Sequence, residues 1–208
     1  MPSVLAIVCV RNEAVHIERC LSDLINGGCD VHLIDNGSTD GTRELASRFL
    51  GAGLLGIDDL EWTGAFSLTA QMEAKNALVA RATHDWIVHA DADESMVSGR
   101  EGESLIDAIS EADAAGYNVI NFHEMAFVPL PGEDFEHPDY ASCMSNYYFF
   151  QPKYPRLNRA WKRSLVIESG SNGHLLKGEG IERSPRDLFL RHYLVRREAH
   201  AERKYVGR

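Results

Sequence analysis

The stretch WIVHADADES, residues 86–95, runs an apolar segment directly into Asp91, Asp93 and Glu94. Residues 85–90 have the length and the continuous apolar character of a strand that is covered on both faces. In open α/β sheets the ligand crevice lies outside the carboxyl ends of the parallel strands. The stretch therefore predicts a buried parallel strand with a polar site at its end.

Strand-like and helical segments alternate around this stretch. We expect strands over 4–10, 30–36, 54–58, 118–127 and 188–195, and helices over 15–25, 42–50, 68–82, 103–116 and 196–208. Such alternation is typical of βαβ units and predicts an α/β fold, with a mostly parallel central sheet and helices on both faces. Residues 128–156 are rich in Pro and aromatic residues without a clear period, so we expect a long, partly ordered loop there.

Length and composition exclude several classes of protein. The chain has 208 residues, 44% of them hydrophobic and 25% charged, which fits a single globular domain. Its apolar runs are shorter than the roughly 20 residues of a membrane span, and its start lacks the basic region and cleavage site of a signal peptide. We therefore expect a cytoplasmic protein. The net charge of −10 and the lack of a basic, aromatic-interleaved motif argue against nucleic acid as a partner.

The charge is unevenly divided along the chain. Residues 1–152 contain 7 Lys and Arg against 25 Asp and Glu, whereas residues 153–208 contain 14 against 6. The basic end predicts either a solvated face or contact with something anionic, such as a diphosphate, a phosphorylated acceptor or a membrane surface.

Three expected strands end in polar residues. Residues 4–10 lead into Arg11-Asn12-Glu13, residues 30–34 into Asp35-Asn36, and residues 85–90 into Asp91-Ala92-Asp93. If these strands are neighbours, their polar ends converge. Asp91 and Asp93 could then approach one cation, and oxygen ligands of this kind suit Mg²⁺ or Mn²⁺ with a phosphate completing the shell. The alternative is a solvated loop, or carboxylates that cap the next helix.

These motifs together resemble glycosyltransferase family 2, whose members have the Rossmann-like GT-A fold. The resemblance rests on VLAIVCVRNEAVHIERCL, LIDNGSTDGTRELA and AKNALVARATHDWIVHADADE, in this order, and covers about residues 3–95. It implies a single GT-A domain over 1–208. Residues 1–100 would form the nucleotide-binding half, and residues 101–208 a variable acceptor-side half with a basic C-terminal segment.

The resemblance also implies roles for individual residues. Asp35 would hydrogen-bond the base, and Lys75 would stand next to the diphosphate or the base. Asp91 and Asp93 would form the D-x-D motif, with Asp93 the direct metal ligand, Asp91 closer to the ribose, and His192 as a third metal ligand. Asn36 replaces an acidic residue that many members have, which leaves the nucleotide open. The turn after the first strand would line the nucleotide pocket, through Val10, Arg11, Asn12 and Glu13.

The implied reaction is the inverting transfer of a sugar from a nucleotide-diphosphate sugar to an acceptor hydroxyl with Mn²⁺ or Mg²⁺, in glycan or cell-surface polysaccharide synthesis. The acceptor would be a glycan or a lipid-linked sugar, with peripheral contact of the basic C-terminal segment at the inner face of the membrane. Two alternatives remain: a nucleotide- or sugar-binding module without turnover, and a sugar nucleotidyltransferase.

The aromatic residues 147–150 and Trp161 are expected to pack rather than to stack on sugars. The catalytic base is open among Glu124, Asp134, Glu168, Glu179 and Glu182.

Overall fold

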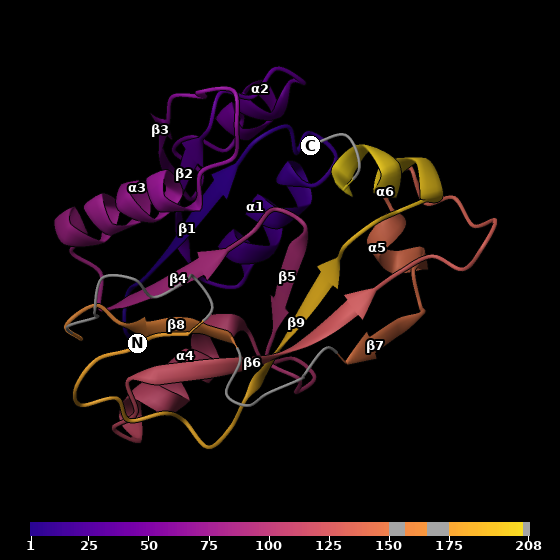
Figure 1. Ribbon diagram of the computed structural model, residues 1–208. Coiled ribbons are helices and arrows are strands. Elements are labelled where there is room, and N and C mark those ends of the chain that lie inside the picture. The colour runs from indigo at the N-terminus through magenta and orange to yellow at the C-terminus, as the bar shows by residue number, and fades with distance from the viewer. Residues whose placement is uncertain (150–156, 166–174, 206–208) are drawn as a thin grey trace.

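A single twisted sheet organises the protein (Figure 1). The computed structural model describes residues 1–149, 157–165 and 175–205, and Glu168 lies outside these ranges. Within them the strand order is β3-β2-β1-β4-β8-β6-β9-β5, with β7 paired to β6. The strands are β1 (Val4–Val10), β2 (Asp30–Asp35), β3 (Leu54–Asp59), β4 (Trp86–Ala90), β5 (Glu94–Val97), β6 (Val119–Phe127), β7 (Tyr147–Phe149), β8 (Leu157–Lys162) and β9 (Leu188–Tyr193).

The first half of the chain forms the parallel part of the sheet. Strands β3, β2, β1 and β4 pair in parallel, with Val10 opposite Asp35 and Val8 opposite Ala90. This register places the carboxyl ends of β1, β2 and β4 side by side. All seven residues of β1 and all five of β4 are buried, as their continuous apolar sequences predict. The expected α/β fold class is confirmed, as is the convergence of the three polar strand ends.

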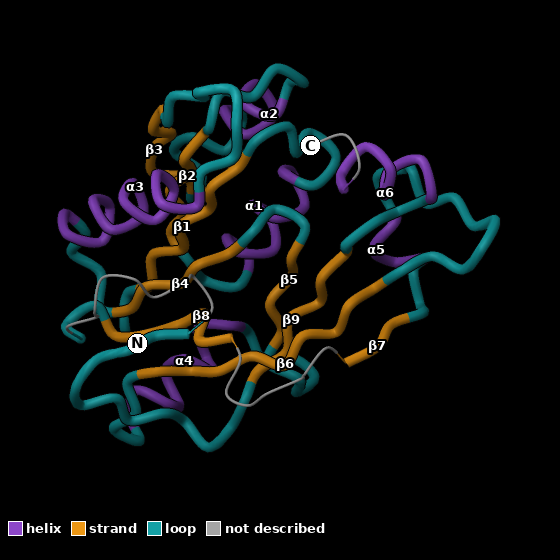
Figure 2. The backbone as a smooth tube through the Cα atoms, in the orientation of Figure 1, coloured by secondary structure: helices purple, strands orange, loops and turns teal. Residues whose placement is uncertain are grey.

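Helices cover both faces of this sheet (Figure 2). Helices α1 and α4 pack on one face, against alternate residues of β1 from Val4 to Val10, whereas α3 packs on the other face, against Leu5 and Ile7. None of the described helices is long and apolar enough to cross a bilayer. The helices are α1 (Ile17–Asn26), α2 (Thr42–Ser47), α3 (Leu68–Arg81), α4 (Leu105–Ala114), α5 (Tyr140–Cys143) and α6 (Glu198–Tyr205).

The second half of the chain extends the sheet with mixed pairing. Strand β8 is antiparallel to β4 on one side and to β6 on the other, while β9 is parallel to β6 and antiparallel to β5. The expectation of a loop over residues 128–156 is wrong in part, because α5 and β7 form within it. The sequence analysis also missed β5 and β8. These strands are short, and β8 follows Pro152 and Pro155, which interrupt any period in the sequence.

The aromatic residues of this half divide into two groups. Trp161 is buried in the core, as expected, and meets the ring of His89 edge to face at a centroid distance of 4.5 Å. Tyr147, Tyr148 and Phe149 of β7 are instead about half exposed, so they pack only in part, through contacts of the Tyr147 ring with Phe127 and Phe149. Phe150 lies outside the described residues. Among the described strands, β7 pairs with β6 alone and therefore lies at an edge, where its side chains have fewer neighbours.

Candidate active site

The loops that follow β1 and β2 are tied together at the carboxyl edge of the sheet. The backbone N–H of Asn12 donates to Ser38 Oγ at 3.0 Å, and the Thr39 N–H donates to Asn12 Oδ1 at 2.8 Å. Asn12 holds a left-handed φ of 57°, a conformation that Asn tolerates better than most residues. The Glu13 N–H donates to Thr42 Oγ1 at 2.7 Å. These bonds fix the turn that the sequence assigns to the nucleotide pocket.

Asp35 and an aromatic ring stand beside this turn. The Asp35 carboxylate is buried, accepts a hydrogen bond from the Ser38 N–H at 3.0 Å and lies 3.4 Å from Arg43 Nη1. The Arg11 guanidinium donates to the Asn36 carbonyl at 2.8 Å and lies over the Trp62 ring, 3.6 Å from its centroid. A flat cation–π pair next to a buried carboxylate suits the recognition of a nucleobase. Sequence reasoning missed Trp62.

The D-x-D turn after β4 is held by a cation from another part of the chain. Arg159 of β8 donates from Nη2 to Asp91 Oδ2 at 2.9 Å and to Glu94 Oε1 at 2.6 Å. Glu94 Oε2 in turn accepts the Asp91 N–H at 3.1 Å. Desolvation alone would raise the pKa of Asp91, but Arg159 and then Lys75 lower it. Burial raises the pKa of Glu94 in spite of Arg159. Sequence reasoning missed both Arg159 and the contribution of Glu94.

Lys75 reaches the same site from α3. Its side chain is buried, and its charge acts on Asp91 and on the thiol of Cys9. Burial raises the pKa of Cys9 to about 11, although Lys75 opposes that rise. Lys75 thus contributes a positive charge at the edge where the family resemblance implies a diphosphate.

His192 joins Asp93 to Glu124. Its Nε2 lies 3.4 Å from Asp93 Oδ2 and its Nδ1 lies 2.7 Å from Glu124 Oε1. Glu124 projects from β6 and His192 from the adjacent β9, while the Tyr193 N–H donates to the Asp93 carbonyl at 2.9 Å. Burial alone would lower the pKa of His192, but the hydrogen bonds to Asp93 and Glu124 raise it to about 11. Both ring nitrogens therefore face carboxylates, and these two contacts favour the protonated form of the ring.

The carboxylates of this site suit a divalent cation whose remaining coordination positions are filled by a bound substrate. In the described part of the chain, no three His, Cys, Asp or Glu side chains form a group that could hold a metal ion. Asp91 and Asp93 nevertheless supply the carboxylate oxygens that Mg²⁺ and Mn²⁺ prefer, and such ions are often held by one or two carboxylates with substrate phosphates. His192 would have to lose its proton to bind a metal. The carboxylates thus fit a site shared with a diphosphate rather than a closed protein cage.

The other candidate bases lie elsewhere. Asp134 is exposed and pairs with Arg197 at 3.4 Å. The Glu182 N–H donates to Asn118 Oδ1 at 2.7 Å, next to the amino end of β6, and Glu179 lines a cavity beside Asn118 at that same end. Among the candidates that the structure describes, Glu124 alone is brought to Asp93 and His192.

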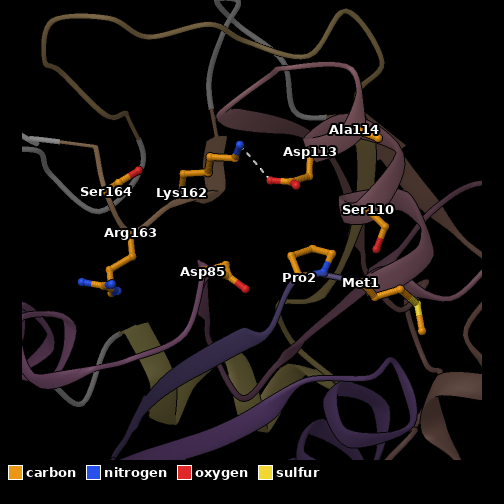
Figure 3. A pocket seen from close by; sticks show the side chains of 9 residues that line it. All are labelled: Met1, Pro2, Asp85, Ser110, Asp113, Ala114, Lys162, Arg163 and Ser164. Atoms are coloured by element: carbon orange, nitrogen blue, oxygen red, sulfur yellow. Dashed lines mark ion pairs between the residues drawn. The ribbon is translucent and has the colours of Figure 1, made fainter.

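A large open cavity lies at the opposite end of the sheet and does not belong to this site. Figure 3 shows it with the ion pair between Lys162 and Asp113, at 2.9 Å, on its wall. Asp85 precedes β4 and Lys162 ends β8, which places this cavity of about 700 Å³ beyond the amino end of β4. Its lining is Met1, Pro2, Asp85, Ser110, Asp113, Ala114, Lys162, Arg163 and Ser164.

Much of the basic charge at the end of the chain is paired internally. Among the residues that the structure describes, five cations from residues 157–197 form ion pairs with carboxylates from residues 1–152. They are Arg159 with Asp91 and Glu94, Lys162 with Asp113, Arg186 with Glu103 and Glu111, Arg196 with Glu136, and Arg197 with Asp134 and Glu136. Part of the basic charge after residue 152 therefore serves contacts within the molecule.

Comparison with known proteins identifies a family. Residues 5–175 match the family described as Glycosyl transferase family 2. A TPR repeat-containing protein of Synechococcus elongatus is 38% identical over 88 residues, which are 42% of this chain and 20% of that protein. The chain thus spans about a fifth of the length of this curated relative.

Solved structures share the fold. The crystal structure of S. aureus TarS has a TM-score of 0.53 and 13% identity, covering 92% of this chain and 37% of that one. TarS 1–349 gives a TM-score of 0.55 at 13% identity and covers 92% of this chain and 60% of that one. The same fragment in complex with UDP gives 0.53 at 14% identity, over 93% and 61%. At these identities the likeness concerns the fold, and the chain spans less than two thirds of TarS.

Proposed function

This chain belongs to glycosyltransferase family 2, and on that basis we propose that it transfers a sugar from a nucleotide-diphosphate sugar to an acceptor hydroxyl. One observation carries the proposal. A single edge of the sheet holds the tied loops after β1 and β2, the D-x-D turn after β4, and the hydrogen-bonded pair of buried Glu124 and half-buried His192. Ligands of open α/β sheets bind at such an edge.

The donor nucleotide would bind over the first half of this edge. The turn Val10–Glu13 would line the pocket, and Asp35 would accept a hydrogen bond from the base beside the Arg11–Trp62 pair. Lys75 would supply positive charge near the diphosphate. The TarS complex contains UDP, which makes a uridine nucleotide the first donor to try.

Asp93 and Asp91 would hold a divalent cation, Mn²⁺ or Mg²⁺, together with the diphosphate oxygens. When bound, such an ion supplies Lewis-acid stabilisation of the charge that develops on the leaving diphosphate. The residues of this chain would fix the D-x-D turn at two points. Arg159 donates to the carboxylate of Asp91, and the backbone N–H of Tyr193 donates to the backbone carbonyl of Asp93. His192 as a third ligand stays a prediction.

Glu124 is the residue that the geometry favours as catalytic base. It is buried, hydrogen-bonded to His192 at 2.7 Å and held by a strand rather than by a loop. A carboxylate at this position can accept the proton of an acceptor hydroxyl as that oxygen attacks the anomeric carbon. Attack from the face opposite to the leaving diphosphate inverts the configuration.

The acceptor would be a glycan or a lipid-linked sugar. The half-exposed rings of Tyr147, Tyr148 and Phe149 at the edge strand β7 support a carbohydrate, since aromatic faces stack on sugar rings. Contact of the basic C-terminal segment with a membrane surface also remains a prediction, and the ion pairs of Arg196 and Arg197 leave less free charge for it.

The first experiment is calorimetric titration of the full chain with UDP, GDP, CDP and dTDP, each with and without Mn²⁺. We expect metal-dependent binding of one nucleotide, and its loss in Asp93→Ala. Release of that nucleoside diphosphate from its sugar conjugates then tests turnover. Binding without any release would favour a module that binds without catalysis. No binding of any nucleotide would refute the proposed donor site.

A further inference from the structure

One guanidinium links a buried carboxylate to a carboxylate that opens into the candidate site. The side chains of Arg159 and Glu94 are only 4% and 1% exposed, whereas that of Asp91 is 44% exposed. Arg159 Nη2 contacts both, at 2.6 Å from Glu94 and 2.9 Å from Asp91. Glu94 also accepts a hydrogen bond from the backbone N–H of Asp91. Asp91 is therefore held both at its side chain, by Arg159, and at its main chain, by Glu94.

An irregularity in β8 aims Arg159 at this turn. Ile120 of β6 pairs with Ala160, but the next residue, Asn121, pairs with Asn158. Arg159 is therefore an extra residue in the ladder between β6 and β8. Extra residues of this kind re-aim side chains and recur next to active sites. The same strand pairs with β4 as far as Val88 and Ala160, which brings Arg159 alongside the end of β4 and the turn beyond it.

We propose that Arg159, braced by Glu94, is a positioning residue that fixes the Asp91–Glu94 turn for binding of a metal–nucleoside diphosphate. The inference rests on the proposed function. Three carboxylates within four residues repel one another unless a cation stands among them. Arg159 supplies that charge from within the protein, and its two contacts determine where Asp91 lies before any ligand arrives.

A purely structural role for Arg159 predicts a different behaviour. A buried ion pair between β8 and β5 could simply join two strands, and its loss would then lower the stability of the fold. The folded molecules that remain would bind nucleotide as before. Positioning predicts weaker binding by molecules that are fully folded. The affinity of folded variants therefore separates the two roles.

The test uses the full chain and three variants. Arg159→Lys keeps the charge but replaces the planar guanidinium, whose Nη2 donates to both carboxylates, by an ammonium on a differently shaped side chain. Arg159→Met removes the charge and leaves Glu94 buried without it, which threatens folding. The double variant Arg159→Met with Glu94→Leu removes both buried charges, a replacement that cores often tolerate. Arg163→Met is the matched control, because Arg163 lies on the same chain segment but faces the cavity at the opposite end of the sheet.

Binding of UDP, GDP, CDP and dTDP in the presence of Mn²⁺ is measured by calorimetry, and folding is checked by circular dichroism and thermal unfolding. For the nucleotide that the wild type binds, we expect the double variant to fold and to bind about 10- to 100-fold more weakly. Arg159→Lys should fall between it and the wild type, and Arg163→Met should bind as the wild type does.

Either of two results would overturn the inference: a folded double variant that binds within twofold of the wild type, or wild-type affinity in Arg159→Lys. If the double variant does not fold, Arg159→Lys decides alone. If the wild type binds none of the four nucleotides, the proposed function fails first. That outcome differs from the one that refutes this inference alone, in which the wild type binds a nucleotide and the variant binds it with equal affinity.

Discussion

Replacement of Glu124 by Gln tests the proposed base most directly. Gln keeps the volume of the side chain and an oxygen that can face His192, but it cannot take up a proton. A positioned general base contributes about 10²- to 10⁴-fold to a rate, which corresponds to about 3–5 kcal/mol of barrier. Glu124 is only 6% exposed, so water cannot easily replace it. We therefore expect kcat to fall toward the upper end of that range.

The affinity for the nucleotide should change little in Glu124→Gln. The proposed contacts of the nucleotide come from the turn after β1, from Asp35, from Lys75 and from a cation held by Asp91 and Asp93, and Glu124 supplies none of them. The assay is release of the nucleoside diphosphate from its sugar conjugate by purified protein, with calorimetry on the same sample. A large loss of kcat with an unchanged dissociation constant is the expected pattern.

Glu182→Gln serves as the matched control, because Glu182 lies next to the amino end of β6, away from Asp93. It should retain wild-type turnover. If Glu124→Gln turns over within threefold of the wild type while it is folded, Glu124 is not the base. An equal loss in both variants would point to a general effect on the fold and would also contradict the assignment.

Three further changes probe the donor site and the stability of the fold. Asp35→Asn should weaken nucleotide binding about 10-fold, since a charged acceptor is lost, and calorimetry measures this. Gly53→Ala should lower the free energy of unfolding by about 2–5 kcal/mol in urea titrations, because Gly53 has a φ of 104° and an added Cβ would lie 2.7 Å from Ile25. The hydrogen bond from Arg186 lowers the pKa of Glu103 to about 2, so this pair stabilises the fold above the unfolded value near 4.5 and loses that contribution as the pH falls toward 2. The stability difference between wild type and Arg186→Gln should therefore be smaller at pH 3 than at pH 7.

The parallel half of the sheet was predictable because each strand there contains a short apolar run between helical segments, and in β1 that run is continuous. Strands β1, β2, β3 and β4 begin and end within one residue of the predicted positions. Both faces of β1 and β4 are covered, so nearly all of their residues are apolar and their patterns are strong, whereas the edge strand β3 buries only Leu54. The polar ends then follow from the parallel register, which is why Asp35, Asp91 and Asp93 were found.

Residues from the mixed half were harder to place. Arg159 lies in the short segment LNRAWK, which shows neither strict alternation nor a continuous apolar run because its strand is irregular. One signal was present: three carboxylates in four residues need a counter-charge, and the basic residues are concentrated after residue 152. The sequence did not distinguish Glu124 from the other candidate bases, because its partner His192 is 68 residues away and only the pairing of β6 with β9 brings the two together.

The place of β8 in the strand order bears on how the chain reaches its final form. Strand β4 cannot complete its hydrogen bonding until residues 157–162 arrive, because β8 occupies its free side. During synthesis the first hundred residues would emerge with the apolar β4 as an open edge, and open apolar edges favour association with other chains. Protein engineers who wish to transplant the nucleotide-binding loops should therefore carry β8 with them, although some sixty residues separate it from β4.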